Sequence, residues 1–253
     1  RIDSRLDTIL VGFFLTPVAV SYYVIGKQAV QFIEMPARAL GFTISPTFGS
    51  QKAEGNFEQV SRIYETALLN SLLLYIPAAA GLMLVAEPLV ELLFGSEYLG
   101  AVPVLQILGL YAVFLSVTNI TNNGLDYLGR ARSRAILKGI TAALNVGLNL
   151  LLIPAIGVVG AAIATVVTHG PYTLAIVYIA SQEFAVHTGV ILREILMITA
   201  VTAVMAGVVF VLLTYIQGWL TLFLVVSIGA LIWVVLSLSV GLLDINEMRS
   251  AIE

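Results

Sequence analysis

A stripe of polar and charged side chains lies inside one apolar segment of the chain. Lys27, Gln31, Glu34 and Arg38 follow one another at intervals of four, three and four residues. On an α-helix these intervals place all four side chains on one face, within roughly 60°. An ionised side chain at membrane depth costs at least ~2.5–3.5 kcal/mol, so the stripe must face protein or water. Lysine and arginine are common phosphate ligands, and the stripe therefore predicts a binding surface for an anion such as pyrophosphate.

The same stripe also has a structural interpretation, which the sequence leaves open. Glu34 and Arg38 can form an ion pair at i,i+4. Asp7, in the preceding segment, is a candidate partner for Lys27. Such pairs would lock two helices together without binding a substrate.

Asparagines form a weaker signal in two later segments. Asn119, Asn122 and Asn123 cluster near the end of one segment, and Asn145 and Asn149 share a face of the next. Amides inside membrane helices most often hydrogen-bond to a neighbouring helix. We nevertheless include Asn145 and Asn149 with Asp7, Lys27, Gln31, Glu34 and Arg38 as candidate substrate-binding residues.

Signals of catalysis are missing from the sequence. His169 precedes a Gly-Pro pair and could relay protons, although a single histidine at a helix break is more often structural. The chain has no cysteine, no phosphate-binding glycine loop, no metal-ligand cluster and no nucleophile–base pairing. We predict a protein that is not an enzyme, with no catalytic residue, no metal site and no cofactor.

The composition identifies the elements that must position these side chains. Hydrophobic residues make up 59% of the chain and charged residues 11%, and the mean hydropathy is +1.01. Soluble domains carry about 25% charged residues, and about 20 consecutive apolar residues span a bilayer. We predict an all-α integral membrane protein, a bundle of about eight transmembrane helices. These helices are expected at roughly 1–15, 20–47, 63–86, 101–125, 136–154, 159–181, 195–214 and 220–242.

Basic residues concentrate in every second loop. That set of loops and the C-terminal tail hold Lys52, Arg62, Arg130, Arg132, Arg134, Lys138, Arg193 and Arg249. The alternate loops hold no basic residue, and the loop at 87–103 carries Glu87, Glu91 and Glu97. By the positive-inside rule, the basic loops and the C-terminus face the cytoplasm. We predict a multi-pass protein of the cell (cytoplasmic) membrane.

A turn is expected at Thr16-Pro17, because proline disfavours helix in the residue before it. The first helix is then too short to cross a membrane. Since the chain starts at Arg1 and not at methionine, we expect this helix to be the remainder of a longer one.

Several ordered motifs resemble a known family. The run at 145–165, NVGLNLLLIPAIGVVGAAIAT, resembles the segment of polysaccharide flippases with two asparagines, Ile-Pro, a glycine turn and GAAIAT. The start, RIDSRLDTILVGFFL, is similar to that family's seventh helix, and Asp7 matches its aspartate. The run at 91–101, ELLFGSEYLGA, resembles its external loop. The family is the Wzx-like polysaccharide transporters of the multidrug/oligosaccharidyl-lipid/polysaccharide exporter superfamily.

The resemblance implies two six-helix lobes around a central cavity, often with two more helices at the C-terminus. Residues 1–181 would be the second lobe with its first helix truncated. Residues 182–253 would add a cytoplasmic loop, two further transmembrane helices and a short cytoplasmic tail. The implied partners are a lipid-pyrophosphate-linked glycan, membrane lipid and a missing N-terminal lobe of the same protein; no nucleic acid is expected.

The implied function is translocation of a lipid-linked oligosaccharide or polysaccharide precursor by alternating access. One alternative is a multidrug or small-metabolite exporter of the same superfamily, for which an acidic, cation-binding cavity is expected. Another is a membrane-embedded glycan polymerase or ligase, which usually has a large external loop with catalytic charges. A third is a scaffold without transport activity.

Overall fold

The computed structural model describes residues 3–53, 57–127, 130–183 and 186–243, and these are almost entirely helical. Within them, side chains are described except at 3–5, 36–53, 57, 127 and 183. The α-helices are α1 (Asp3–Phe14), α2 (Pro17–Ala53), α3 (Phe57–Leu84), α4 (Ala86–Phe94), α5 (Val102–Tyr127), α6 (Ala131–Ile156), α7 (Val158–Glu183), α8 (Thr188–Leu212) and α9 (Trp219–Val240). Short 3₁₀ helices cover Ser96–Ala101 and Leu213–Tyr215.

Six of the described helices are long and apolar enough to cross a membrane, namely α3, α5, α6, α7, α8 and α9. The predicted all-α membrane fold is therefore confirmed. The turn expected at Thr16-Pro17 is also present, because α1 ends at Phe14 and α2 begins at Pro17. Helix α1 has 12 residues, about 18 Å at 1.5 Å per residue, which is too short to span the hydrocarbon core.

One predicted loop is wrong over part of its length. The segment expected as the loop at 87–103 contains α4 and the following 3₁₀ helix. Helix α4 forms because its apolar side can pack on the bundle: Ala86 and Val90, at i,i+4, are buried, whereas Glu87 and Glu91 are exposed.

Helix α6 begins five residues before the predicted position 136. The added residues, ARSRA, are mostly good helix formers, so the helix extends through them. Arg132 and Arg134, which were predicted in a loop, therefore lie on a helix.

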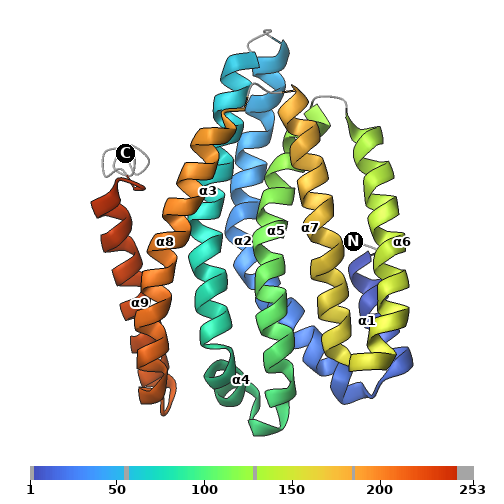
Figure 1. Ribbon diagram of the computed structural model, residues 1–253, viewed down its shortest axis with the longest axis vertical. Helices are drawn as coiled ribbons and strands as arrows, with labels where there is room; N and C mark the ends of the chain where they lie inside the picture. The colour runs from blue at the N-terminus through green and yellow to red at the C-terminus, as the bar shows by residue number, and fades with distance from the viewer. Residues whose placement is uncertain (1–2, 54–56, 128–129, 184–185, 244–253) are drawn as a thin grey trace.

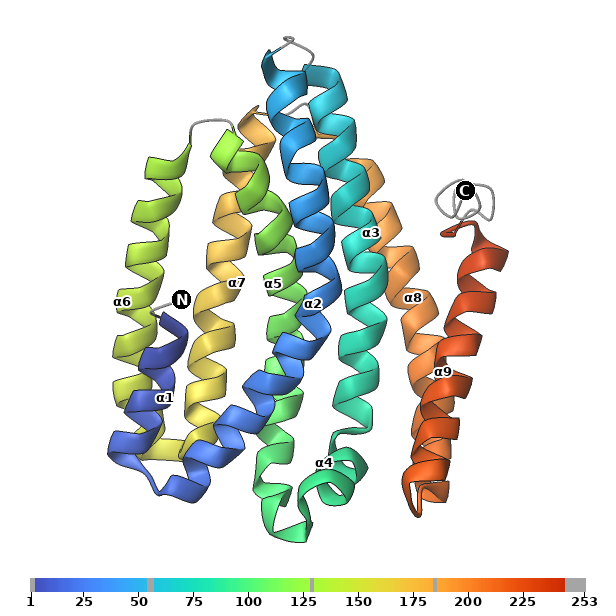
Figure 2. The same ribbon diagram turned by 180° about the vertical axis from the view of Figure 1, so that it is seen from behind.

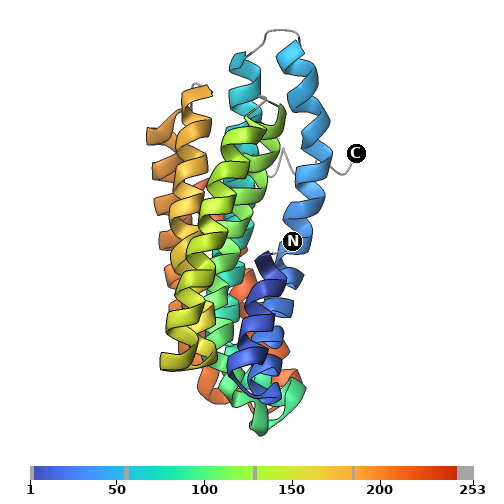
Figure 3. The same ribbon diagram turned by 90° about the vertical axis from the view of Figure 1, so that its right-hand side faces the viewer.

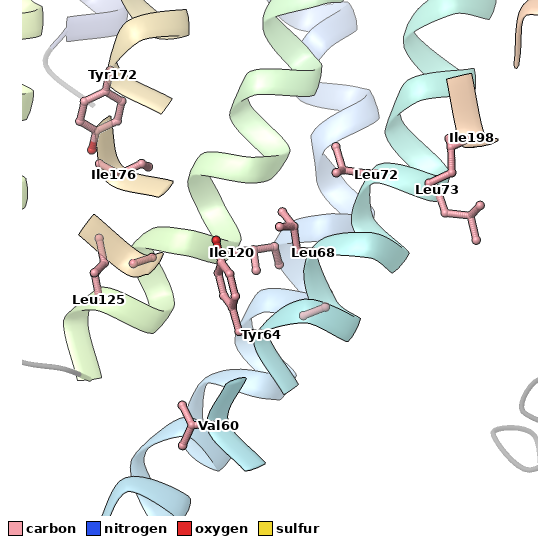
Figure 4. Packing of buried hydrophobic residues seen from close by; sticks show 12 residues of the cluster. Val60, Tyr64, Leu68, Leu72, Leu73, Ile120, Leu125, Tyr172, Ile176 and Ile198 are labelled. Carbon is pink, nitrogen blue, oxygen red and sulfur yellow. The ribbon is translucent and has the colours of Figure 1, made fainter. Parts of the chain in front are cut away.

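Helix α5 stands in the middle of the bundle and packs against α2, α3 and α7. The α8–α9 hairpin packs against α3 at one edge, and α6 packs against α7 at the other (Figures 1 and 2). Figure 3 shows α1 and α2 together on one side of the bundle. A large apolar cluster between α3, α5, α7 and α8 includes Leu68, Ile120, Ile176 and Ile198 (Figure 4).

Figure 2 shows α2 running obliquely from its start beside α1 and then upright beside α3. Its 37 residues extend about 55 Å at 1.5 Å per residue. The last turns of α2, α5 and α7 and the first turns of α3, α6 and α8 lie at one end of the molecule, and α4 lies at the other (Figure 1). Arg62, Arg132 and Arg134 are thus near one end, and Glu87 and Glu91 of α4 are at the other.

Candidate binding cavity

A cavity of about 930 Å³ lies among α1, α2, α5, α6 and α7. This volume is at the upper end of the range for small-molecule sites, about 300–1,000 Å³. Its charged lining residues are Asp7, Lys27, Glu34, Arg134 and Lys138. Amides, hydroxyl groups and His169 complete the polar lining. Five of the seven predicted residues line it: Asp7, Lys27, Gln31, Glu34 and Asn145.

Asp7 is the centre of a buried hydrogen-bonded cluster at one side of the cavity. Its side chain is only 5% exposed. Tyr23 Oη donates to Asp7 Oδ2 at 3.0 Å, and Asn149 Nδ2 donates to Asp7 Oδ1 at 3.0 Å. Tyr23 Oη also lies 3.1 Å from Thr165 Oγ1. The cluster thus joins α1, α2, α6 and α7 through one carboxyl group, which is how a buried acid is satisfied.

The two α6 asparagines continue this network toward α7. Asn149 Nδ2 donates to Asn145 Oδ1 at 2.9 Å, and Asn145 Nδ2 lies 3.3 Å from Thr168 Oγ1. Asn145 lines the cavity, whereas the fully buried Asn149 is not among its lining residues. The interhelical hydrogen bonding expected of such amides is therefore present, and Asn149 positions Asp7. Contact of either residue with a substrate stays a prediction.

The predicted stripe on α2 faces the cavity over its described part. Lys27 Nζ lies 3.4 Å from Thr8 Oγ1 and 5.3 Å from the centre of the Tyr23 ring, within reach of a cation–π contact. The Gln31 side chain lines the cavity and is exposed. Arg38 belongs to α2, but its side chain lies outside the described residues, so both its role and its pairing with Glu34 stay predictions.

Glu34 is the deepest member of the stripe, with 2% of its surface exposed. Asn119 Nδ2 donates to Glu34 Oε1 at 2.9 Å and joins α5 to α2. Between α5 and α7, Tyr172 Oη donates to Asn122 Oδ1 at 3.4 Å, and the rings of His169 and Tyr111 meet edge to face with their centres 4.7 Å apart. The α5 asparagines thus connect helices around the cavity, as expected for membrane amides.

Two basic lining residues, Arg134 and Lys138, were not among the predicted site residues. They continue the line of the α6 asparagines, since Arg134, Lys138, Thr141, Asn145 and Asn149 follow one another at intervals of four, three, four and four. The helical spacing that identified the stripe on α2 would have found this one. Arg134 was missed because α6 was expected to begin at residue 136, and Lys138 because it was counted with the basic loop before that helix.

Three cations and two carboxyl groups therefore share the cavity wall. Both carboxyl groups accept hydrogen bonds from neighbouring amides, and Asp7 accepts one more from Tyr23. Among the described residues, no group of three or more histidines and acids could hold a metal ion. Such a surface can hold an anionic group by hydrogen bonding and charge.

Proteins of known family are similar to this chain in sequence. A probable low-salt glycan biosynthesis flippase, Agl15, of Haloferax volcanii is 27% identical over 237 residues, which are 93% of this chain and 50% of that protein. The chain thus spans about half the length of this relative.

Solved structures share the fold. The inward closed conformation of the lipid II flippase MurJ superposes with a TM-score of 0.68 at 19% identity, covering 94% of this chain and 50% of that one. An outward-facing multidrug resistance MATE family transporter of the MOP superfamily gives 0.66 at 19% identity, covering 85% and 50%.

Residues 2–229 also match the sequence family described as lipid II flippase MurJ. The match runs from α1 into α9 and includes every helix that lines the cavity. The superfamily expected from the sequence motifs is thereby confirmed. This chain belongs to the MurJ lipid II flippase family.

Proposed function

We propose that the chain forms one lobe of a flippase that moves a lipid-linked oligosaccharide or polysaccharide precursor across the cytoplasmic membrane by alternating access. In this proposal the cavity holds the phosphate or pyrophosphate of the lipid carrier, and the lipid chains stay in the bilayer. The protein acts by transport and not by catalysis. Lys27, Gln31 and Asn145 contact the substrate, and Asp7, Glu34 and Asn149 position the wall.

The observation that carries this proposal is the position of Lys27. It lies on α2, which packs between the candidate membrane spans α3 and α5, and it faces a cavity of about 930 Å³ with a polar lining. A cation at membrane depth is costly unless water or an anion compensates it, so such residues mark transport paths. The name of the Haloferax relative, a probable glycan biosynthesis flippase, supports a glycan substrate.

The proposal includes a companion lobe. The cavity is bounded by helices of this chain on some sides only, and the least buried candidate span, α6, is one of its walls. The chain also matches about half of the aligned MurJ and MATE structures. We propose that a second lobe closes the cavity, and that the basic connections and the C-terminus lie in the cytoplasm, as the positive-inside rule predicts.

Drug export is the second candidate, because Asp7 and Glu34 could bind a cationic compound and the MATE fold is similar. Both carboxyl groups, however, already accept hydrogen bonds from buried side chains. Binding a cation there would require these bonds to rearrange. The three basic residues of the same wall favour an anion.

The test is flipping of a fluorescent prenyl-pyrophosphate oligosaccharide in proteoliposomes. Lys27→Gln should lower the rate by about 10–100-fold, because a hydrogen bond to a charged group contributes about 1.5–3 kcal/mol. Arg62→Gln is the matched control, since Arg62 is exposed and pairs with Glu58 on the surface of α3. An unchanged rate for Lys27→Gln, or efflux of cationic drugs without glycan flipping, refutes the proposal.

A further inference from the structure

Two basic residues line the cavity from the first two turns of α6. Arg134 and Lys138 are four residues apart, so they project from the same face of the helix. Asn122 and Asn123 of α5 line the same cavity. Two cations and two amides are the side-chain types that bind phosphate oxygens.

This group is separated along the bundle from the Asp7 cluster. Arg134 precedes Asn149, which donates to Asp7, by 15 residues on one helix, a rise of about 22 Å at 1.5 Å per residue. For Lys138 the rise is about 16 Å. Lys27 lies over the ring of Tyr23, which itself donates to Asp7. A pyrophosphate group is only a few ångströms long, so it cannot contact Arg134 and the Asp7 cluster at once.

Arg134 forms an ion pair with Asp126, which is not among the residues that line the cavity. Its Nη1 donates to Asp126 Oδ2 at 2.8 Å, and Asp126 is near the end of α5. The two side chains are 29% and 40% exposed. Exposed ion pairs contribute little stability, so an incoming anion can take the place of the Asp126 carboxylate at low cost.

We propose that Arg134 and Lys138 form a second phosphate-binding site, which we call the mouth subsite, at the basic end of the cavity. The phosphate or pyrophosphate of the lipid-linked substrate binds there before it reaches Lys27. Asp126 holds Arg134 in the empty state and is displaced by the anion. This inference rests on the proposed function, because the mouth subsite would be the first position that the substrate's phosphate occupies on its way through the cavity.

The experiment measures binding of farnesyl pyrophosphate to the purified protein in nanodiscs by isothermal titration calorimetry, with farnesol as the uncharged comparison. The double variant Arg134→Gln/Lys138→Gln should bind farnesyl pyrophosphate about tenfold more weakly, because charge-assisted hydrogen bonds are lost. Arg132→Gln, an exposed neighbour that does not line the cavity, should bind like the wild type.

Replacing Asp126 gives a test whose expected result, tighter binding, could not come from a misfolded protein. Asp126→Asn should bind the probe about two- to fivefold more tightly, because the competing carboxylate is gone. In the Arg134→Gln background the same change should have no effect, since there is no longer a cation to release. If Asp126 and Arg134 only fasten the α5–α6 turn, Asp126→Asn leaves the affinity unchanged or lowers it, and the mouth subsite is refuted.

The outcomes separate this inference from the proposed function. If Lys27→Gln weakens binding while the double variant binds normally, the mouth subsite is wrong and the proposed function stands. If the double variant binds weakly and Lys27→Gln binds normally, the mouth subsite stands and the assigned role of Lys27 is wrong. If the wild type binds farnesyl pyrophosphate no better than farnesol, both are overturned.

Discussion

Replacing Asn149 with alanine tests whether the buried cluster around Asp7 holds the lobe together. Asn149 is fully buried, and its amide donates to Asp7 at 3.0 Å and to Asn145 at 2.9 Å. Asn149→Ala removes both hydrogen bonds and takes one donor from a buried carboxyl group.

Two estimates bracket the loss of stability. Interhelical hydrogen bonds in membranes contribute about 0.6 kcal/mol on average and up to about 1.7 kcal/mol. A buried acceptor that loses its donor costs about 1–3 kcal/mol. We expect a loss of about 2 kcal/mol, which corresponds to a fall in Tm of roughly 4–8 °C for a chain of this size.

The assay follows the intrinsic fluorescence of Trp219 and Trp233 while the purified protein is heated in detergent. Leu151→Ala is the control, because this neighbour on α6 is 70% exposed and should lower Tm by less than about 1 °C. With Asp7→Asn in place, Asn149→Ala should cost less, since the carboxylate is gone. A Tm for Asn149→Ala equal to that of the control, or independent effects in the double mutant, would refute the reasoning.

Two further predictions concern packing and the α7–α8 connection. Gly160→Ala should lower the free energy of unfolding by about 1–3 kcal/mol in the same melting assay, because a Cβ atom there would collide with the backbone of α6. Gly147→Ala, where no atom lies within 4 Å of the added Cβ, should have no such effect. Glu65→Ala should speed hydrogen exchange of the His187 amide by about 5–10-fold, because Glu65 Oε1 accepts from that N–H at 2.6 Å. The same change at the exposed Glu58 should leave the exchange unchanged, and equal rates in both variants would contradict the prediction.

The helices that cross the membrane could be predicted from the sequence because apolar runs and breaker residues identify them. Runs of about 20 apolar residues gave the six candidate spans, and Thr16-Pro17 gave the first turn. Helix α4 could not be predicted in this way. Its nine residues are too few for a clear periodicity, and its stability depends on burial of Ala86 and Val90 against other helices.

The candidate site was predictable where charge contrasts with its surroundings. Lys27 and Glu34 stand out in an apolar segment, and their spacing placed both on the cavity wall. Tyr23 and Thr165 could not be found, because their hydroxyl groups look like any others in the sequence. Only the fold brings them together, across 142 residues. Arg134 was assigned to a loop because the beginning of α6 was placed too late.

The turn between α6 and α7 has a mechanical consequence. It consists of Gly157 alone, with φ of +69°, a conformation that glycine adopts without strain. Close to it, Gly160 packs directly on the backbone of α6, so the two helices are in close contact at their joined ends. They therefore cannot slide past each other at this end of the lobe, which holds Asn149 and Thr165 in register beside Asp7. Helix α7 is packed on α5, whereas α6 contacts α5 sparsely, so a change in the width of the cavity displaces the part of α6 that lies far from this turn.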